Sequence, residues 1–402
     1  MSASPLVLRN AQVLDVRAGE YRQADVFMSD GRIKAIGQVD APGVAELDLT
    51  GKYLLPGLID CHVHASAATA DLGEIETISP TYVAARSARI LGEMLRRGFT
   101  TVRDAGGADH GLAAAQEDGL IEGSRVFFCG TALSQTGGHG DFRGAGENSH
   151  SHCCASVGRV ADGVPAVRAA ARDELRKGAH HIKIMASGGI ASKTDRMDST
   201  QYSVSEISAI VEEATAANRY VAAHAYTPRA INRCLELGVR SIEHGNLADQ
   251  SSFDLFLQHD AFLVPTLSTH WALTDEGRQF GLSEESWRKV GTIFEDGVET
   301  VRAAAAQGVK IVFATDLLGG MQRHQSYEFE IRARIQSNID VIRSATTVAA
   351  ELLQREGELG ELVEGAIADA VILEADPLED IGVLAQFSER GNRVIQSGRL
   401  IV

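Results

Sequence analysis

The sequence is poor in the residues that mark disordered or disulfide-stapled chains. Only 8 of its 402 residues are proline, while 44% are hydrophobic and 23% are charged, a balance that argues against wholesale disorder. Its five cysteines are odd in number and scattered, which favours reduced thiols over a disulfide framework. We therefore expect a globular chain with a large core, in two to three ordinary domains or in one large barrel with an appendage.

Basic residues are also in the minority. Lys and Arg total 38 against 54 Asp and Glu, and the net charge of -16 repels polyanions, so neither nucleic acid nor an anionic membrane is expected as a partner. No window contains about 18 uninterrupted apolar residues, and the first ten residues lack the basic start and apolar core of a signal peptide. These absences predict a cytoplasmic location.

The middle of the sequence has a regular alternation of two patterns. From residue 57 to about residue 340, apolar strand-like runs alternate with amphipathic helical stretches, several of which end at a glycine such as Gly98, Gly178, Gly238 or Gly308. Eight strands are predicted, over 58–64, 99–104, 125–130, 180–186, 219–225, 240–244, 261–267 and 310–316. Helices are predicted over 81–97, 164–177, 205–217, 296–307 and 344–355. Eight such repeats predict a (β/α)8 TIM barrel, in which reactive groups lie at the C-terminal ends of the strands.

The two ends of the chain have the pattern of short strands joined by turns. This pattern covers 6–10, 12–16, 25–28 and 32–36 at the start, and 370–373 and 393–402 at the end. We expect residues 1–56 and 359–402 to form one small β-sandwich domain together, beside a barrel of residues 57–358.

Candidate metal ligands end several predicted barrel strands. His62 and His64 follow an apolar run, and the strand period of two places both imidazoles on one face. Four more side chains of suitable chemistry lie at or near the ends of other strands, namely Lys183, His224, His244 and Asp316. Because strand ends of one barrel converge on its axis, these six groups are expected to meet.

The motifs around these residues carry a family resemblance. The chain resembles the amidohydrolase superfamily in its segment Pro56-Gly-Leu-Ile-Asp-Cys-His-Val-His64, in its fourth-strand lysine, in two later strand-end histidines and in Ala314-Thr-Asp316. The segments 136–141, 182–189 and 224–231 are similar to the prolidase-like Xaa-Pro and Xaa-Arg dipeptidases, a branch that includes ochratoxin-degrading amidohydrolases.

The resemblance implies a binuclear centre, usually zinc, and a homo-oligomer. It assigns His62, His64 and Asp316 to one metal ion and His224 and His244 to the other, with a carboxylated Lys183 as the bridge. The chemistry agrees, since an ammonium cannot be a ligand whereas an amine buried beside cations can capture CO2. A shared hydroxide would attack the amide carbonyl, and Asp316 would take its proton and pass it to the departing amine.

Further residues are predicted to handle the substrate. His139, in a glycine-rich loop, and Tyr226, on the strand face of His224, are placed to donate hydrogen bonds to the carbonyl or its oxyanion. Arg229, in the first turn of a helix, is predicted to grip a substrate carboxylate. Leu317 suggests an apolar wall for a side chain such as that of Phe or Pro.

One long connecting segment, from residue 131 to residue 161, contains His150, His152, Cys153 and Cys154. These residue types could bind another zinc ion, but a mobile active-site lid is the favoured interpretation for a connection of this length.

We therefore predict a metal-dependent amidohydrolase that removes the C-terminal residue from a dipeptide or an N-acyl amino acid, including ochratoxin-type amides. A lactonase or cyclic-amide hydrolase is the alternative among enzymes, since the same chemistry opens esters and ring amides. A deaminase is disfavoured because mononuclear deaminases do not need the bridging lysine. A non-catalytic scaffold is disfavoured because all six ligand positions are filled.

Overall fold

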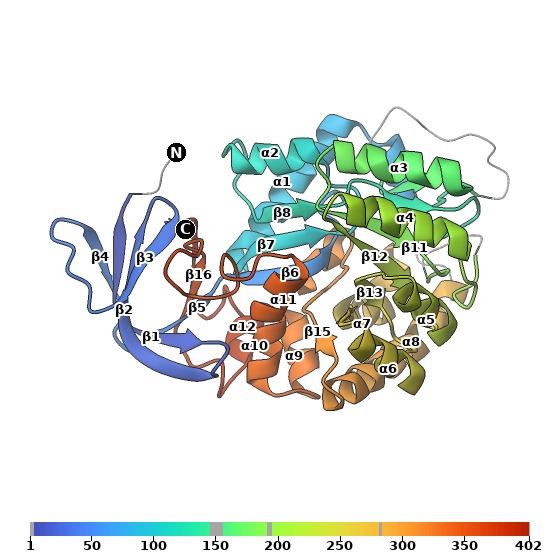
Figure 1. Cartoon of the computed structure of the whole chain (residues 1–402). Coiled ribbons are helices and arrows are strands. Elements are labelled where there is room, and N and C mark those ends of the chain that lie inside the picture. Colours follow the sequence, from blue (N-terminus) through green and yellow to red (C-terminus); the bar gives the residue numbers. More distant parts are fainter. Residues whose placement is uncertain (1–3, 145–155, 191–194, 281–283, 402) are drawn as a thin grey trace.

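A computed structural model describes residues 4–144, 156–190, 195–280 and 284–401. Two bodies of secondary structure are visible in it, a sheet built from both chain ends and a larger ring of strands surrounded by helices (Figure 1). Among the helices of the described ranges, none combines the length and the apolar character needed to cross a membrane.

The larger body is the predicted barrel, and each of the eight predicted strands is present. They are β6 (Leu58–Val63), β7 (Phe99–Asp104), β8 (Arg125–Phe128), β11 (His181–Met185), β12 (Tyr220–Ala225), β13 (Ser241–His244), β14 (Phe262–Val264) and β15 (Lys310–Ile311). Successive strands pair in parallel as two ladders. Backbone bonds close the ring: His180 N donates to Phe128 O at 2.8 Å, and Cys61 N donates to Phe313 O at 2.9 Å.

Helices cover the outside of the ring. The longer ones are α1 (Pro80–Arg96), α2 (His110–Glu117), α3 (Val164–Arg176), α4 (Val204–Ala216), α5 (Pro228–Glu236), α6 (Gln250–Gln258), α7 (Leu267–Glu276) and α8 (Glu284–Ala306). The shorter ones are α9 (Tyr327–Ala333), α10 (Asn338–Ser344), α11 (Thr347–Leu352) and α12 (Gly382–Ala385), with 3-10 turns η1 (Leu72–Thr77), η2 (Gly277–Phe280) and η3 (Gly319–His324). The predicted ends of α1, α3 and α4 are correct to within one residue, and the four predicted terminal glycines all have positive φ.

Two predicted helices differ from the structure. The helix expected over 344–355 is shorter in the structure, where α11 follows a separate helix, α10, that ends at Ser344. Between the two, the carbonyl oxygens of Ser344 and Ala345 accept backbone hydrogen bonds from Phe313 and Ile59 of the barrel. The helix expected from 296 begins at Glu284 instead. Its internal Gly297 is explained by close packing, since a Cβ there would lie 2.4 Å from Nδ2 of Asn246.

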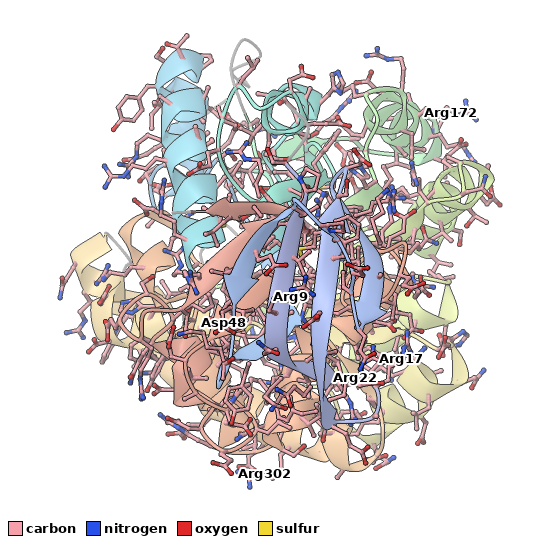
Figure 2. The ribbon with its side chains drawn as sticks, turned by 90° about the vertical axis from the view of Figure 1, so that its left-hand side faces the viewer. Arg9, Arg17, Arg22, Asp48, Arg172 and Arg302 are labelled. Atoms are coloured by element: carbon pink, nitrogen blue, oxygen red, sulfur yellow. The ribbon has the colours of Figure 1, made fainter. Side chains whose placement is uncertain are left out.

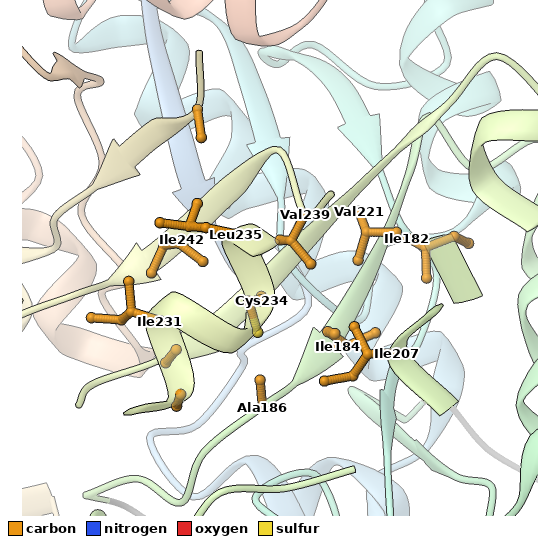
Figure 3. Close-up of a cluster of buried hydrophobic side chains, with 14 of the residues drawn as sticks. Ile182, Ile184, Ala186, Ile207, Val221, Ile231, Cys234, Leu235, Val239 and Ile242 are labelled. Atoms are coloured by element: carbon orange, nitrogen blue, oxygen red, sulfur yellow. The ribbon is translucent and has the colours of Figure 1, made fainter. Parts of the chain in front are cut away.

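Strand alternation separates the barrel interior from the layer under the helices. On the outer side, Ile182, Ile184, Val221 and Ile242 pack against Ile231 and other residues of α4 and α5 (Figure 3). On the inner side, Ile59, Phe127, Ala222, Phe262 and Val312 come from strands around the ring and form a second apolar cluster. This alternation leaves polar side chains such as Lys183 and His224 directed to the interior.

The two chain ends combine in one β domain, as predicted, and their strands form a single sheet. It consists of β1 (Leu6–Asp15), β2 (Glu20–Ser29), β3 (Arg32–Gly37), β4 (Ala45–Asp48), β5 (Tyr53–Pro56), β16 (Ala370–Leu373), β17 (Arg393–Gln396) and β18 (Arg399–Ile401). Its order is β18-β17-β16-β5-β1-β2-β3, and β4 also pairs with β1. The antiparallel pair of β5 and β16 joins the first part of the chain to the last.

This chain-end sheet has an apolar inside and a charged outside. Leu8, Val26, Ile372 and Ile395 belong to a buried cluster of its own. Figure 2 looks onto the outer face, where Arg9 of β1 forms ion pairs with Asp25 and Glu46 on the two flanking strands. The sheet thus has its own core, and the candidate site residues all lie in the barrel.

Candidate active site

Three predicted ligands meet where β6 and the segment after β15 leave the barrel. Nε2 of His64 lies 3.2 Å from Oδ1 of Asp316, and Nε2 of His62 lies 3.5 Å from the same oxygen. One ligand atom from each residue lies within 4.8 Å of the other two. Two imidazole nitrogens and a carboxylate oxygen at this spacing fit a divalent ion with the preferences of zinc.

Buried Asp60 holds the two segments together. Its Oδ1 accepts from the backbone N–H of His62 at 3.1 Å, and its Oδ2 accepts from the Thr315 hydroxyl at 2.6 Å. Asp60 therefore fixes a residue from each segment, so the cluster of His62, His64 and Asp316 rests on a rigid support.

The other two predicted histidines adjoin this cluster. The ring centroids of His224 and His244 are 4.6 Å apart, and the His244 ring lies 5.2 Å from that of His62. The four imidazoles therefore form a continuous group at the C-terminal ends of β6, β12 and β13.

Each imidazole has one ring nitrogen held by the protein. Nδ1 of His62 lies 2.7 Å from Oε2 of Glu243, and Nδ1 of His64 lies 2.8 Å from the carbonyl oxygen of Gly106. Nδ1 of His244 lies 2.8 Å from the Thr266 hydroxyl, and Nε2 of His224 lies 3.2 Å from the carbonyl oxygen of Gly188. Such contacts fix ring direction and tautomer in metal sites, and they leave the second nitrogen available as a ligand.

The ionisation of these groups suits metal binding. Burial lowers the pKa of His62 to about 4, and burial with neighbouring imidazoles holds the pKa values of His224 and His244 well below their usual range. Burial alone would raise the pKa of Asp316, but the adjacent His62 and His64 lower it to about 2. The site thus offers an ionised carboxylate and, at His62, His224 and His244, neutral imidazoles, which are the forms that bind metal, whereas Asp316 raises the pKa of His64 against the effect of burial.

Lys183 lies among these residues in the barrel interior. It is 2% exposed, and within the described ranges no hydrogen-bond partner is found for its amine. Burial lowers the pKa of Lys183, against the opposing influence of Glu243 and Asp316. A buried lysine without a hydrogen-bonded carboxylate fits an amine that is used chemically rather than as half of a salt bridge.

The group that supports His62 is not among the residues predicted from the sequence. Glu243 and Arg103 are fully buried, and both oxygens of the carboxylate accept from Nη2 of the guanidinium, at 2.8 and 2.7 Å. The signal was present in the sequence, because a charged residue inside an otherwise apolar strand requires a buried partner.

Backbone strain also marks two ligands. His244 has a φ of +70° and Asp316 a φ of +51°, a left-handed region that residues other than glycine seldom adopt. At His244 this turn reverses the alternation of β13, so that His244 and Glu243 both face the site although they are neighbours in the chain. Strain of this kind is concentrated at functional sites.

His139 lies against the second pair of histidines. Its ring stacks on that of His224 with centroids 4.2 Å apart, and its backbone N–H donates to Oε1 of Gln201 at 2.9 Å. A Cβ on Gly189 would lie 2.1 Å from the His139 ring, so this approach requires glycine there. Asp195, a further residue that the sequence analysis missed, has an oxygen 3.9 Å from Nδ1 of His139.

Tyr226 is buried beside the same group and has an unforeseen partner. Its ring stacks on that of His244 with centroids 5.1 Å apart, and its hydroxyl lies 3.2 Å from Nε2 of His270. His270 comes from α7 and is 1% exposed. No strand end or motif marks it in the sequence, so it is not among the predicted site residues.

The structure separates the last two predicted substrate residues. Leu317 is buried in an apolar cluster with Ala67, Leu318 and Met321, directly after Asp316. Arg229 is exposed, and its Nη2 donates to the carbonyl oxygen of Asp198 at 2.8 Å. Arg229 thus shares no hydrogen bond with the other candidate site residues of the described chain.

The segment with His150, His152, Cys153 and Cys154 lies outside the described residues, so its predicted role stays a prediction.

Comparisons with known proteins agree on one family for this chain. Residues 53–399 match the model of the Amidohydrolase family. The chain is 34% identical to the ochratoxinase of Aspergillus niger over 393 residues, which cover 91% of this chain and 80% of that protein.

Solved structures agree in fold over nearly the whole chain. A prolidase in complex with N-methylphosphonate-L-proline has a TM-score of 0.96 and 49% identity, with 99% of each chain covered. A Xaa-Pro dipeptidase with bound methionine has a TM-score of 0.88 and 27% identity, with 99% of this chain and 100% of that chain covered. The predicted resemblance is thereby confirmed: the chain belongs to the amidohydrolase family and is a hydrolase of amide bonds.

Proposed function

We propose that this protein is a binuclear metal-dependent peptidase of small substrates, which hydrolyses the amide bond of dipeptides or N-acyl amino acids with a free C-terminal carboxylate. One observation carries the proposal. Four imidazoles, each with one nitrogen held by the protein, form a continuous group, to which Asp316 and the buried Lys183 belong. A purely structural barrel has no need of such a costly set of buried polar groups.

The proposed ligands divide into two sets. His62, His64 and Asp316 would hold one ion, while His224 and His244 would hold the other, with Lys183 as a carboxylated bridge. A pair of zinc ions bound there would polarise the scissile carbonyl and lower the pKa of water toward neutrality.

The remaining steps belong to side chains of the protein. Asp316, ionised in this environment, is the group that accepts the proton of the attacking water and passes it to the departing amine. His139 and Tyr226 would orient the substrate carbonyl from the side of His224. The apolar cluster of Leu317 would face an apolar side chain of the substrate.

The relatives support this choice of substrate class. One solved relative is a prolidase that binds a phosphonate derivative of proline, and the ochratoxinase of A. niger is a relative with substantial identity over most of this chain. We therefore expect proline on the C-terminal side of the scissile bond, and the apolar cluster of Leu317 would also accept an aromatic side chain such as that of phenylalanine.

A substrate panel tests the proposal directly. Purified protein is loaded with zinc, its metal content is measured, and it is offered Xaa-Pro and Xaa-Phe dipeptides, their N-acyl counterparts, the C-terminal amides of both, and a set of lactones. We expect about two zinc ions per chain and release of the C-terminal amino acid from free acids. Turnover of lactones without any amide hydrolysis would overturn the proposal, and so would a full panel without turnover in protein that retains its metal.

A further inference from the structure

His139 lies in a glycine-rich loop over 135–141, the His139 loop, which follows β9 (Ala132–Ser134). Three of its seven residues are glycine, a composition that by itself allows many backbone conformations. Yet the His139 ring stacks on that of His224 with centroids 4.2 Å apart, and the proposed function requires it to reach the substrate carbonyl from there. The loop therefore needs a support, because a displacement of about 1 Å near the reacting atoms can slow turnover by about 10²-fold.

Two glutamines join the His139 loop to the segment that precedes α4, by reciprocal hydrogen bonds. Oε1 of Gln201 accepts from the backbone N–H of His139 at 2.9 Å. In the opposite direction, Oε1 of Gln135 accepts from the backbone N–H of Tyr202 at 2.5 Å. Gly138 permits this close approach, since a Cβ there would lie 2.8 Å from Oε1 of Gln201. The loop and the segment are thus each held by a side chain of the other.

The amide of Gln201 has one orientation that satisfies its neighbours. The N–H of His139 can only donate, so it faces Oε1, and Nε2 then faces Oδ2 of Asp195, to which it donates at 2.6 Å. The backbone of Gln201 is also bound, because its N–H donates to the carbonyl oxygen of Ala186 at 2.8 Å and its carbonyl accepts from Nη2 of Arg233 at 2.5 Å. Gln201 is 2% exposed, so these bonds are shielded from water. It therefore ties the His139 loop to the end of β11.

The residue after Gln201 has a strained backbone. Tyr202 is buried in the apolar layer under the helices, and its φ of +55° lies in the left-handed region that a bulky side chain rarely adopts. Conformations of this kind persist where the surroundings determine the backbone, and they are concentrated at functional sites. The bond to Gln135 contributes to that determination, because it fixes the Tyr202 N–H. The strain therefore favours a role of this segment in the site.

We propose that Gln201 is a positioning residue, which with Gln135 holds His139 against His224 so that the His139 ring reaches the substrate carbonyl. The inference rests on the proposed function, because it concerns how His139 meets the substrate of that reaction. Gln201 acts through the backbone N–H of His139, so its loss should affect turnover only as long as His139 is present.

Three changes to the amide of Gln201 separate positioning from packing. Gln201→Met keeps the length of the side chain and removes both of its hydrogen bonds. Gln201→Glu keeps an acceptor for the His139 N–H but places a carboxylate against that of Asp195. Addition of Asp195→Asn to Gln201→Glu restores one donor and one acceptor in reversed order, at the total charge of the wild type. Gln250→Met is the matched control, because the Gln250 amide is likewise paired, with that of Gln307 on the surface.

The measurements are kcat and KM on the best dipeptide of the panel, zinc content, and hydrogen exchange of the segment 135–141. We expect Gln201→Met to lower kcat about ten- to thirtyfold, as for the loss of two net hydrogen bonds, with KM changed by less than about twofold and zinc content unchanged. Exchange in the segment should become faster, since the His139 N–H loses its acceptor. In a His139→Ala background, Gln201→Met should cost no further activity.

The charge variants should follow the same order. Gln201→Glu should be about as slow as Gln201→Met, and the added Asp195→Asn should return most of the rate. Gln250→Met should match the wild type in every measurement. The pair of charge variants also keeps the test decisive if Gln201→Met does not fold.

The opposite results are equally definite. A kcat of Gln201→Met near that of the wild type would overturn the inference, and so would a loss in Gln201→Glu that Asp195→Asn does not reverse. Equal losses from Gln201→Met with and without His139 would make Gln201 a packing residue. A wild-type protein that hydrolyses no member of the panel refutes the proposed function, whereas an active wild type with an unaffected Gln201→Met refutes only this inference.

Discussion

The two halves of the candidate site are built from similar histidines but carry different charge. In the half formed by His62, His64 and Asp316, an ionised carboxylate contacts both rings, and Asp316 raises the pKa of His64 against the effect of burial. In the half formed by His224 and His244, the partners of the rings are a carbonyl oxygen and a hydroxyl, and both pKa values lie well below their usual range.

This difference indicates what the second half needs. A divalent ion among neutral imidazoles would carry its full charge into a buried environment, which is costly without a nearby anion. Lys183 is the residue that could supply one, because burial lowers its pKa, and the amine in its neutral form can take up CO2, lose a proton and become a carboxylate. The first half is therefore expected to bind metal by itself, and the second half only with a modified lysine.

Removal of Lys183 should abolish metal binding in the second half of the site and cause the largest loss of activity. We expect Lys183→Ala to retain one zinc ion per chain at most and to lose activity by well over ~10²-fold, which exceeds the loss typical when an outer partner of a ligand is removed. Metal analysis and turnover measure the two losses. Lys177→Ala removes an exposed lysine at the end of α3 and should change neither.

Addition of a short carboxylic acid sharpens this test. Formate or acetate can occupy the position of the missing carboxylate, so part of the zinc and of the rate should return to Lys183→Ala. A variant that keeps two zinc ions and normal turnover without such addition would show that the lysine is not the bridge.

Loss of the carboxylate from the first half should affect turnover more than structure. Asp316→Asn keeps the shape of the side chain and tolerates the φ of +51°, but it cannot take up a proton, so kcat should fall by about 10²-fold or more. Asp260→Asn is the matched control, because Asp260 has the same φ and is exposed. A kcat near that of wild type in Asp316→Asn would assign the proton transfer to another group.

The support of His62 offers a milder disturbance of the first half. Glu243→Asp keeps the charge that Arg103 requires but shortens the side chain, so the carboxylate withdraws from Nδ1 of His62. Zinc affinity, measured by competition with a chelator, should fall by about 10- to 100-fold. Glu213→Asp makes the same change in a carboxylate paired with arginines on the surface of α4 and should leave affinity unchanged.

Features set by local sequence patterns could be predicted from the sequence, whereas features set by the packing of distant segments could not. The barrel could be predicted because its strands are short, largely apolar runs and several main helices end at a glycine with positive φ, such as Gly98. The meeting of His62 with Asp316 then followed from the barrel itself, whose first and last strands are neighbours. Cytoplasmic location and homo-oligomer formation stay predictions.

Contacts between segments that are distant in the sequence could not be predicted in this way. The pairing of Tyr226 with His270 depends on where α7 begins and on the tautomer that Thr266 imposes. The break between α10 and α11 depends on which barrel N–H groups need acceptors. Neither is written in the local pattern of the sequence, because each arises only when distant segments pack.

The smallest effect is expected at Arg229, on the helix that follows the second half of the site. Its guanidinium is exposed and already donates to Asp198, so a substrate carboxylate would meet it in water, where such a pair contributes about 0.2 to 1 kcal/mol. Arg229→Ala should therefore lower kcat/KM for free acids by no more than about fivefold, since about 1.4 kcal/mol corresponds to tenfold. Arg233→Ala, which removes a similar bond to a backbone carbonyl one turn later, is the control. A hundredfold loss confined to free acids, with the corresponding C-terminal amides unaffected, would mean that substrate binding buries the guanidinium and that Arg229 is the carboxylate clamp.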